Sequence, residues 1–285
     1  SDEEVINFGL IPHVNRGIFA INELPDLQPR IQVALLNIMQ ERDIQIRGFN
    51  IRFPLDVLIV FSANPEDYTN RGNIITPLKD RIDSQIITHY PKTPEVGRKI
   101  TRQEAWIERE QVSIHVPEFV RDIIEQVAIE ARESEYIDQK SGVSTRLTIT
   151  AMEQLLSSAE QRAYLNDEEK SNVRITDIFN IVPALTGKLE LVYEGEQEGA
   201  INVAKHLIGK AVDKEFTRYF PDPQEHKTGS EEDDENRYES VINWFANGKK
   251  LVLSDRLSEE KYRNELDKVD GLKALTGEYM DVDND

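Results

Sequence analysis

Two apolar runs in this sequence end in polar side chains of the kind that bind ligands. The first run, residues 18–21, ends at Asn22 and Glu23, and the second, residues 57–61, is followed closely by Asn64. Apolar runs without polar alternation are typical of parallel strands that are covered on both faces. Ligand sites of α/β proteins lie at the carboxyl ends of such strands. The runs therefore predict two buried strands whose ends carry candidate site residues.

The first run has a family resemblance. Residues 17–27, Gly-Ile-Phe-Ala-Ile-Asn-Glu-Leu-Pro-Asp-Leu, resemble the Walker B segment of the AAA+ ATPases, most closely that of the magnesium-chelatase and MoxR branch. The resemblance implies that Asn22 holds the Mg²⁺ of bound ATP through water and that Glu23 orients the attacking water as a catalytic residue. Asn22 departs from the family's Asp, because its carbonyl oxygen carries no charge. Alone, the run fits a buried strand ending in a polar turn equally well.

The following segment resembles two further parts of the same family. Residues 43–54 alternate apolar and polar side chains around Arg47-Gly48, which predicts a β-hairpin. Its position resembles the presensor insertion near the pore of a ring, although an exposed edge hairpin is the alternative. Residues 57–65 resemble the sensor 1 strand, which implies that Asn64 hydrogen-bonds the γ-phosphate or the attacking water. An amide suits this role because it donates and accepts without adding negative charge.

An arginine follows at the place where the family carries its arginine finger. Residues 76–82, Thr-Pro-Leu-Lys-Asp-Arg-Ile, resemble that segment and imply that Arg81 is catalytic across a subunit boundary. A guanidinium suits the task because it stays charged and spreads over several phosphate oxygens. Arg71 is the weaker candidate. The structural alternative is that Arg81 only pairs with Asp80 or Asp83.

A second arginine lies in a Ser/Gly-rich turn. Residues 141–146, Ser-Gly-Val-Ser-Thr-Arg, resemble the sensor 2 turn, which implies that Arg146 binds the nucleotide at the start of a lid helix. The alternative is a helix capped by Ser144. A cation in the first turn opposes the helix dipole, so an anionic partner for Arg146 is expected.

The predicted fold class is α/β, a partial P-loop (AAA+) parallel sheet followed by an α-helical lid domain. The last strand of the sheet is expected at residues 84–90. Apolar periodicity predicts the later helices. They are expected from Pro117 onward and over residues 145–165, 176–193 (kinked at Pro183), 198–220 and 258–275. The predicted domains are residues 1–92 (core fragment with the hairpin), 93–220 (lid), 221–236 (acidic linker) and 237–285 (helical acidic appendage).

Composition limits the classes of protein that this chain can represent. The 285 residues carry a formal net charge of −19 and no Cys, and no apolar stretch approaches a membrane span. Ser-Asp-Glu-Glu at the start lacks the basic and apolar regions of a signal peptide. We expect a cytoplasmic protein without disulfides or a membrane contact. The acidic balance repels phosphate backbones and weighs against nucleic acid as a main partner.

The sequence also lacks one motif that the family resemblance requires. No Gly-x-x-x-x-Gly-Lys-Ser/Thr phosphate-binding loop occurs in the chain. The expectation is therefore a C-terminal piece whose phosphate loop lies upstream, and which alone neither binds nor hydrolyses ATP appreciably.

The resemblance implies ATP hydrolysis, with ATP and Mg²⁺ as cofactors, coupled to remodelling of a protein or metal-chelatase client. It also implies a homo-oligomeric ring, expected to be a hexamer, and a partner protein with a von Willebrand A domain. The first alternative is a non-hydrolysing interaction module, which Asn22 and the missing loop suggest. The second is a DNA-associated AAA+ motor.

Overall fold

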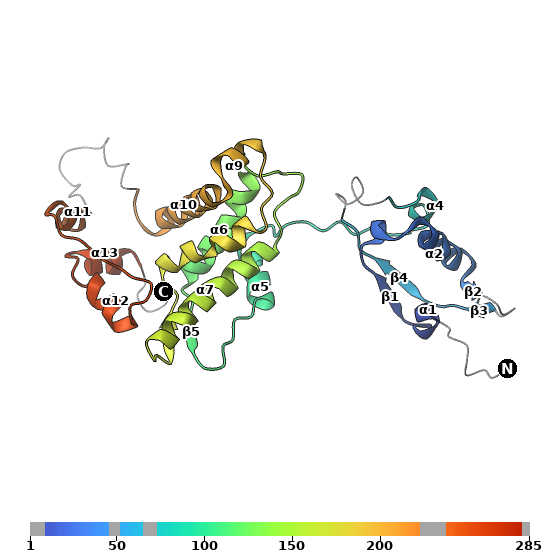
Figure 1. Cartoon of the computed structure of the whole chain (residues 1–285), viewed down its shortest axis with the longest axis horizontal. Helices are drawn as coiled ribbons and strands as arrows, with labels where there is room; N and C mark the ends of the chain where they lie inside the picture. The colour runs from blue at the N-terminus through green and yellow to red at the C-terminus, as the bar shows by residue number, and fades with distance from the viewer. Residues whose placement is uncertain (1–8, 46–51, 65–72, 223–237, 281–285) are drawn as a thin grey trace. The chain divides into compact units, whose positions relative to one another are not determined.

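The computed structural model describes residues 9–45, 52–64, 73–222 and 238–280 of the chain (Figure 1). The chain divides into two compact units, Ser1–His89 and Tyr90–Asp285, and each unit is described by itself. The domain limits at residues 92, 220 and 236 remain predictions. The acidic linker lies outside the described residues except for Pro221 and Asp222.

The first unit combines short strands with short helices. Its elements are α1 (Leu10–His13), β1 (Ile18–Ile21), η2 (Leu24–Asp26), α2 (Pro29–Glu41), β2 (Asp43–Gln45), β3 (Arg52–Pro54), β4 (Leu58–Phe61) and α4 (Thr76–Lys79). The predicted hairpin is present as the antiparallel pair β2–β3. Its tip, including Arg47, lies outside the described residues.

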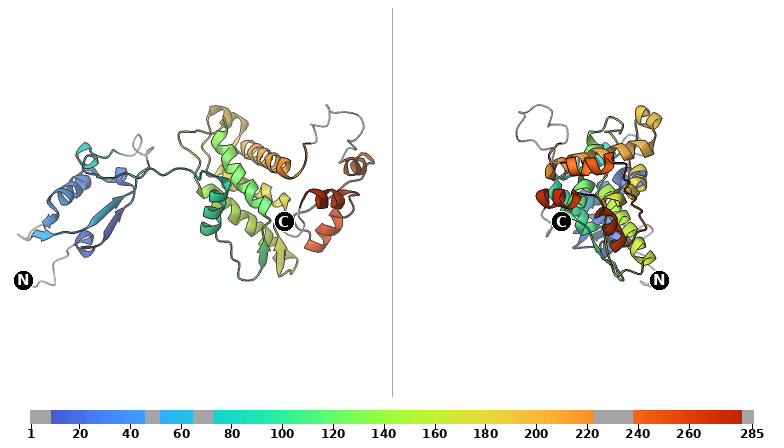
Figure 2. Two further views of the ribbon diagram at one scale, coloured as in Figure 1. Left: turned by 180° about the vertical axis from the view of Figure 1, so that it is seen from behind. Right: turned by 90° about the vertical axis from the view of Figure 1, so that its left-hand side faces the viewer.

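The two predicted apolar strands, β1 and β4, pair with each other in parallel (Figure 1; seen from behind in Figure 2). Ile18 lies opposite Leu58, and Ile21 lies opposite Phe61. The pairing continues before the strands, where the Arg16 N–H donates to the Asp56 carbonyl at 2.6 Å. Parallel pairing brings both carboxyl ends to the same edge. The predicted α/β class, with a helical part after it, is confirmed.

The burial predicted for these strands is wrong. Ile18 is 65% exposed and Leu58 60% exposed, and the side chains alternate between exposed and half-buried positions. The reason is that the described sheet holds only these two strands. Two strands with few helices around them cannot cover both faces of an apolar run.

The strand predicted at residues 84–90 does not form. These residues have no regular secondary structure, and Ile86 and Ile87 are 89% and 80% exposed. A strand exists only when a neighbour takes up its hydrogen bonds, and none of the described strands pairs with this segment. Its apolar side chains are therefore left exposed.

The second unit is mainly helical. Its first elements are α5 (Pro94–Glu104), β5 (Ser113–His115), α6 (Glu118–Glu133), α7 (Arg146–Leu165), β6 (Lys170–Asn172), η3 (Ile175–Ile181), α8 (Val182–Thr186), α9 (Tyr193–Glu198) and α10 (Ala200–Tyr219). The C-terminal elements are α11 (Glu239–Ala246), α12 (Glu259–Leu266) and α13 (Leu272–Tyr279). Strands β5 and β6 form a short parallel pair.

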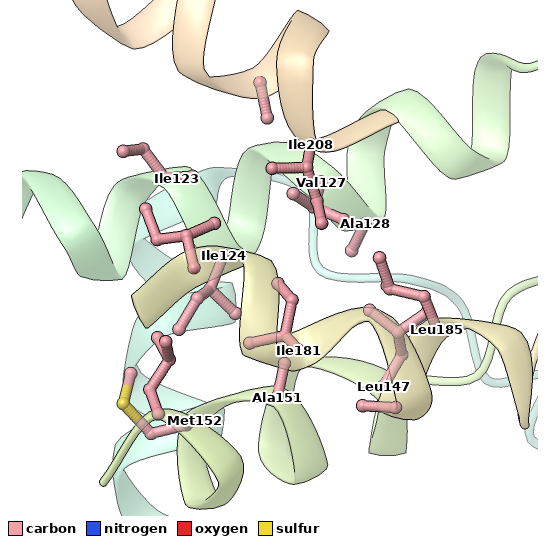
Figure 3. Close-up of a cluster of buried hydrophobic side chains, with 14 of the residues drawn as sticks. Ile123, Ile124, Val127, Ala128, Leu147, Ala151, Met152, Ile181, Leu185 and Ile208 are labelled. Atoms are coloured by element: carbon pink, nitrogen blue, oxygen red, sulfur yellow. The ribbon is translucent and has the colours of Figure 1, made fainter. Parts of the chain in front are cut away.

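The core of this unit forms where α6, α7, α8 and α10 meet (Figure 3). Ile124 from α6, Leu147 from α7, Leu185 from α8 and Ile208 from α10 are each fully buried. The apolar stripe of α6 recurs at three- and four-residue spacing, so one face of the helix enters this cluster. The predicted helices at 145–165 and 198–220 match α7 and α10 closely.

Two predicted helices are broken. The helix expected over residues 176–193 is the 3₁₀ segment η3 followed by the short α8, and Leu191 then forms a β-bridge with Ile137. The helix expected over residues 258–275 splits into α12 and α13, because Gly271 adopts φ 83° between them. In both segments the helical spacing of apolar side chains continues across the break, so the sequence pattern predicts one continuous helix where the structure has two elements.

Among the residues that the structure describes, no helix is both long enough and apolar enough to span a membrane.

We predict that the bare sheet makes the first unit prone to self-association. Replacing Ile18 and Leu58 together with Thr removes exposed apolar surface while keeping strand propensity. Apolar dye binding and concentration-dependent association are expected to fall, while the free energy of unfolding changes by no more than about 0.5 kcal/mol per site. Unchanged dye binding would show that these side chains are covered in solution.

A second prediction concerns a buried carboxyl in α6. Glu125 accepts a hydrogen bond from Thr101 Oγ1 at 2.6 Å, and burial raises its pKa from the ordinary value of 4.5 although this hydrogen bond lowers it in part. Its surroundings include Arg98, Arg132 and Asp122. Since the native state binds this proton more tightly than the unfolded chain, the free energy of unfolding falls as the pH rises above 4.5 toward the raised pKa.

The Glu125→Gln variant removes this titration but keeps an acceptor for Thr101. We expect its stability relative to the unchanged chain to increase between about pH 4 and pH 7, measured by urea unfolding at several pH values. Glu133→Gln, at an exposed position of the same helix, is the matched control. A pH-independent difference between Glu125→Gln and the unchanged chain would contradict the prediction.

Candidate functional site

The carboxyl ends of β1 and β4 form a continuous edge. Beyond the strands, the Ser62 N–H donates to the Ile21 carbonyl and the Leu24 N–H donates to the Ser62 carbonyl, both at 3.0 Å. The backbone pairing thus extends past the last strand residues. As a result, Asn22, Glu23 and Ser62 lie together at the same edge.

Ser62 is the centre of this edge, and sequence reasoning missed it. Its Oγ donates to Asn22 Oδ1 at 3.2 Å and accepts from the Glu23 backbone N–H at 3.3 Å. One hydroxyl therefore holds the side chain of one predicted site residue and the backbone of the next. The only available signal was its position directly after the second apolar run.

Glu23 has an unusual backbone. It lies in the left-handed region at φ 53° and ψ 54°, which is costly for a residue with a Cβ. The next residues, Leu24 and Pro25, are buried and begin η2. The buried Leu24 and Pro25 that follow, together with the hydrogen bond from the Glu23 N–H to Ser62 Oγ, hold Glu23 in this conformation. The Glu23 side chain stays exposed. Strain of this kind is concentrated at functional sites.

Asn64 lies two residues beyond Ser62, at the same end of β4, and is exposed. The structure thus brings Asn22 and Glu23 together through Ser62 and places Asn64 next along the chain. Within the described residues, no group of three or more His, Asp or Glu side chains could hold a metal ion. The oxygens of Asn22 and Glu23 still suit the waters of a nucleotide-bound Mg²⁺, which needs few protein ligands.

Arg81 follows α4 and forms an ion pair with Asp80 at 3.2 Å. This is one of the two partners that the sequence suggested as an alternative to a finger role. Both side chains are exposed, by 39% and 78%, so water screens the pair and it contributes little stability. The pairing therefore does not prevent the guanidinium from reaching another anion. Arg71, the weaker candidate, lies outside the described residues.

A buried glutamine of α2 positions the segment that leads to Arg81. Gln32 donates from Nε2 to the carbonyls of Leu27 at 2.9 Å and Asn73 at 3.1 Å, and its Oε1 accepts from the Ile75 N–H at 2.9 Å. The side chain is 1% exposed, so each of these bonds replaces one that water would make. Sequence reasoning missed Gln32, because a single polar residue on an apolar helix face carries no periodic signal.

Arg146 belongs to the second unit, where it is the first residue of α7 and is exposed. The helix begins one residue later than the capping alternative supposed, with Thr145 at the N-cap position, while Ser144 Oγ accepts from the Arg146 N–H at 3.2 Å. The role of Arg146 at a nucleotide stays a prediction.

The turn before Arg146 is tied to the first residue of the unit. The Val143 N–H donates to the Tyr90 hydroxyl at 2.8 Å, and the Arg132 guanidinium lies 4.2 Å from the centre of the Tyr90 ring. Gly142 has φ 70°, and a Cβ there would lie 2.6 Å from the same hydroxyl. Only glycine fits this position, because any side chain would collide with Tyr90.

One family model matches the chain. Residues 3–87 match the Sigma-54 interaction domain, an AAA+ ATPase domain of the sigma-54 activator type. This segment contains the edge described above. The match does not specifically support the magnesium-chelatase and MoxR branch that the sequence motifs suggested.

Two solved structures are also similar to the chain. A candidate ATPase from Cytophaga hutchinsonii is 22% identical over 69% of this chain and 65% of its own, with a TM-score of 0.27. NtrX from Brucella abortus, in complex with ADP, is 14% identical over 92% of this chain and 51% of its own, with a TM-score of 0.36. The chain thus spans less than two thirds of either protein, and scores this low do not establish a shared fold. No curated protein matches the chain.

The backbone of Glu23 leads to a prediction about stability. The Glu23→Gly variant relieves the left-handed strain of about 1–2 kcal/mol, offset by about 0.5–1 kcal/mol of chain entropy. We therefore expect a net gain of roughly 0.5–1 kcal/mol in the free energy of unfolding of the first unit. Glu23→Ala removes the same carboxylate but keeps the strain, so it should give no gain. Equal stability of the two variants would mean that Glu23 is not held in this conformation in solution.

Proposed function

We propose, from the premise that residues 3–87 are part of an AAA+ ATPase domain, that the edge at Asn22, Glu23 and Ser62 is the hydrolytic side of an ATP site. The observation that carries the proposal is the parallel pairing of β1 with β4, which brings the Asn22 side-chain oxygen and the Glu23 backbone N–H to one hydroxyl, that of Ser62. The matched family segment contains this same edge.

Each residue of the edge has a distinct task in this proposal. Bound ATP with Mg²⁺ supplies the phosphoanhydride bond and the charge of the metal. The Glu23 carboxylate accepts a hydrogen bond from the attacking water and orients it. The hydrogen bond from Ser62 fixes the Asn22 amide, and the second lone pair of Asn22 Oδ1 can accept from a metal-bound water. Asn64 is proposed to contact the γ-phosphate.

The phosphates need further ligands, because the 285 residues contain no phosphate-binding loop. Backbone amides and a loop lysine normally cradle the β- and γ-phosphates, and the proposed activity requires a partner segment that supplies them. Arg81 is proposed to reach the nucleotide of a neighbouring subunit, and Arg146 is proposed to bind the nucleotide from the lid. Both guanidinium groups are exposed and available for such contacts.

The biological role proposed for this activity is remodelling of a protein client by a ring-shaped homo-oligomer. Two types of client are consistent with the chain. The family match favours a sigma-54-type transcription partner, whereas the motifs around Asn22 suggest a chelatase or MoxR-type client. Co-purification with sigma-54 or with a protein containing a von Willebrand A domain distinguishes these possibilities.

The principal test is ATP hydrolysis by an assembly that combines this chain with a phosphate-binding loop. Glu23→Gln is expected to lower kcat by at least about 10²-fold while ATP binding persists, because only the orientation of the water is lost. Gln28→Glu, an exposed change nearby that adds a carboxylate, is a control expected to keep full activity. The 285-residue chain alone is expected to show no turnover. Full activity of Glu23→Gln would exclude the proposed catalytic role of this residue, whereas no turnover by the unchanged assembly would favour a non-hydrolysing interaction module.

A further prediction concerns Asn22. An Asp at this position adds a negative charge beside the metal, and charge-assisted hydrogen bonds are stronger than neutral ones by about 1–2 kcal/mol. Asn22→Asp is therefore expected to lower the Mg²⁺ concentration for half-maximal turnover by roughly ten- to thirtyfold. An unchanged Mg²⁺ requirement would place Asn22 away from the metal.

A further inference from the structure

The C-terminal elements have almost no hydrophobic core of their own. Helices α12 and α13 contain no buried residue, and among residues 238–280 only Trp244 and Val269 are buried apolar side chains. The buried core cluster of the second unit, by contrast, lies entirely within residues 105–211. The position of residues 238–280 therefore depends on surface contacts with the rest of the unit.

The first of these contacts is aromatic and lies at the end of α10. The Tyr238 hydroxyl donates to the Pro221 carbonyl at 2.6 Å, and its ring lies 6.4 Å from that of Phe216. Phe220 lies 5.7 Å from Tyr279. These contacts anchor both ends of the C-terminal segment beside α10.

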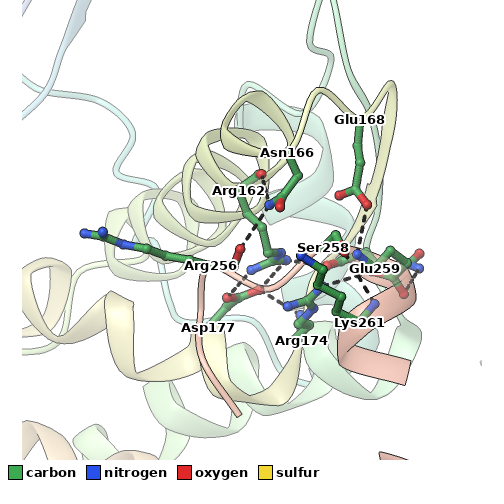
Figure 4. A network of polar contacts seen from close by, with 10 residues as sticks. Arg162, Asn166, Glu168, Arg174, Asp177, Arg256, Ser258, Glu259 and Lys261 are labelled. Atoms are coloured by element: carbon green, nitrogen blue, oxygen red, sulfur yellow. Dashed lines mark hydrogen bonds and ion pairs between the residues drawn. The ribbon is translucent and has the colours of Figure 1, made fainter. Parts of the chain in front are cut away.

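The second contact is polar and involves the start of α12 (Figure 4). Glu259 Oε2 pairs with Arg174 Nη2 at 3.3 Å, and its Oε1 accepts from Asn172 Nδ2 at 2.9 Å. The Glu259 backbone N–H donates to Glu168 Oε1, also at 2.9 Å. Both the side chain and the backbone of one residue are thus recognised.

An aromatic ring completes this contact. The Arg174 guanidinium lies 3.9 Å from the centre of the Tyr262 ring, a cation–π arrangement. Glu259 and Tyr262 are three residues apart and so share one face of α12. Ser258 caps the helix by accepting from the Lys261 N–H at 3.4 Å. The stretch Ser-Glu-x-x-Tyr at residues 258–262 is therefore what Arg174 recognises.

The position of Arg174 favours an acidic ligand. Arg162 binds Asp177 through two hydrogen bonds at 2.7 and 3.0 Å, and the Arg174 backbone N–H donates to Asp177 Oδ2 at 2.8 Å. Arg162 is paired with Asp177, whereas the Arg174 guanidinium pairs with the Glu259 carboxylate of the ligand. Among the described residues, Arg174 Nε and Nη1 are buried without a hydrogen-bond partner. These two donors therefore still lack acceptors when Glu259 occupies the site.

We propose that Asn172, Arg174 and Glu168 form a binding site for the start of an acidic helix, and that residues 258–262 are its resident and releasable ligand. The aromatic anchor at α10 keeps this segment near its site, so a partner's acidic helix competes against a high local concentration. Release exposes Arg174 to that partner.

Hydrogen exchange of the full chain, followed by mass spectrometry, tests the release. Glu259→Gln removes the charge but keeps an acceptor, and Glu260→Gln makes the same change at an exposed neighbour in α12. We expect Glu259→Gln to exchange about tenfold faster both in residues 256–266 and in residues 168–177, since the ligand and its site open together. Glu260→Gln should match the unchanged chain. Faster exchange confined to residues 256–266, or equal behaviour of the two variants, overturns the proposal.

A labelled peptide of residues 254–268 tests the site itself. It should bind the Glu259→Gln chain at least about tenfold more tightly than the unchanged chain, whose site is already filled. The same peptide carrying the Glu259→Gln change should lose this preference. Equal binding to both chains, or no binding to either, excludes an exchangeable acidic-helix site. Neither experiment involves ATP, so both outcomes are independent of the proposed ATPase activity.

Discussion

The parallel pairing of β1 with β4 is the constraint on which the candidate site depends. Successive side chains in a strand point to opposite faces, so a slip of one residue would exchange every inward and outward position. Side chains fix the register at both ends of the pair. Asn15 Oδ1 accepts from the Asp56 N–H before the strands, and Ser62 joins Asn22 and Glu23 after them. The chemistry of the edge follows from this register, because it places Ser62 beside Asn22 and Glu23.

The sequence predicts these strands well because each is a short apolar run ended by polar residues. It predicts their burial badly. An apolar run indicates which surface favours burial, but it does not indicate whether other elements of the chain are present to bury that surface. The same reason explains residues 84–90, where a strand-like sequence finds no strand to pair with. Ser62 and Gln32 were not predicted, since each acts through individual hydrogen bonds that no periodic pattern reveals.

In the second unit, apolar periodicity predicts α6, α7 and α10, whose faces meet in one core. It fails where a helix ends so that its residues can contact a distant part of the sequence. Leu191, for example, forms a β-bridge with Ile137. The polar network around Arg174 was also beyond prediction. It joins residues more than 80 positions apart, and local sequence reasoning finds only neighbours along the chain.

The contact between Tyr90 and the turn at Gly142 has a mechanical consequence. Tyr90 is the residue at which the chain enters the second unit, and Val143 lies three positions before Arg146. The Tyr90 hydroxyl therefore ties the entering chain to the turn that precedes α7. Because a Cβ at Gly142 would lie 2.6 Å from that hydroxyl, a single added methyl group would displace Tyr90 and loosen the entry of the chain into this unit.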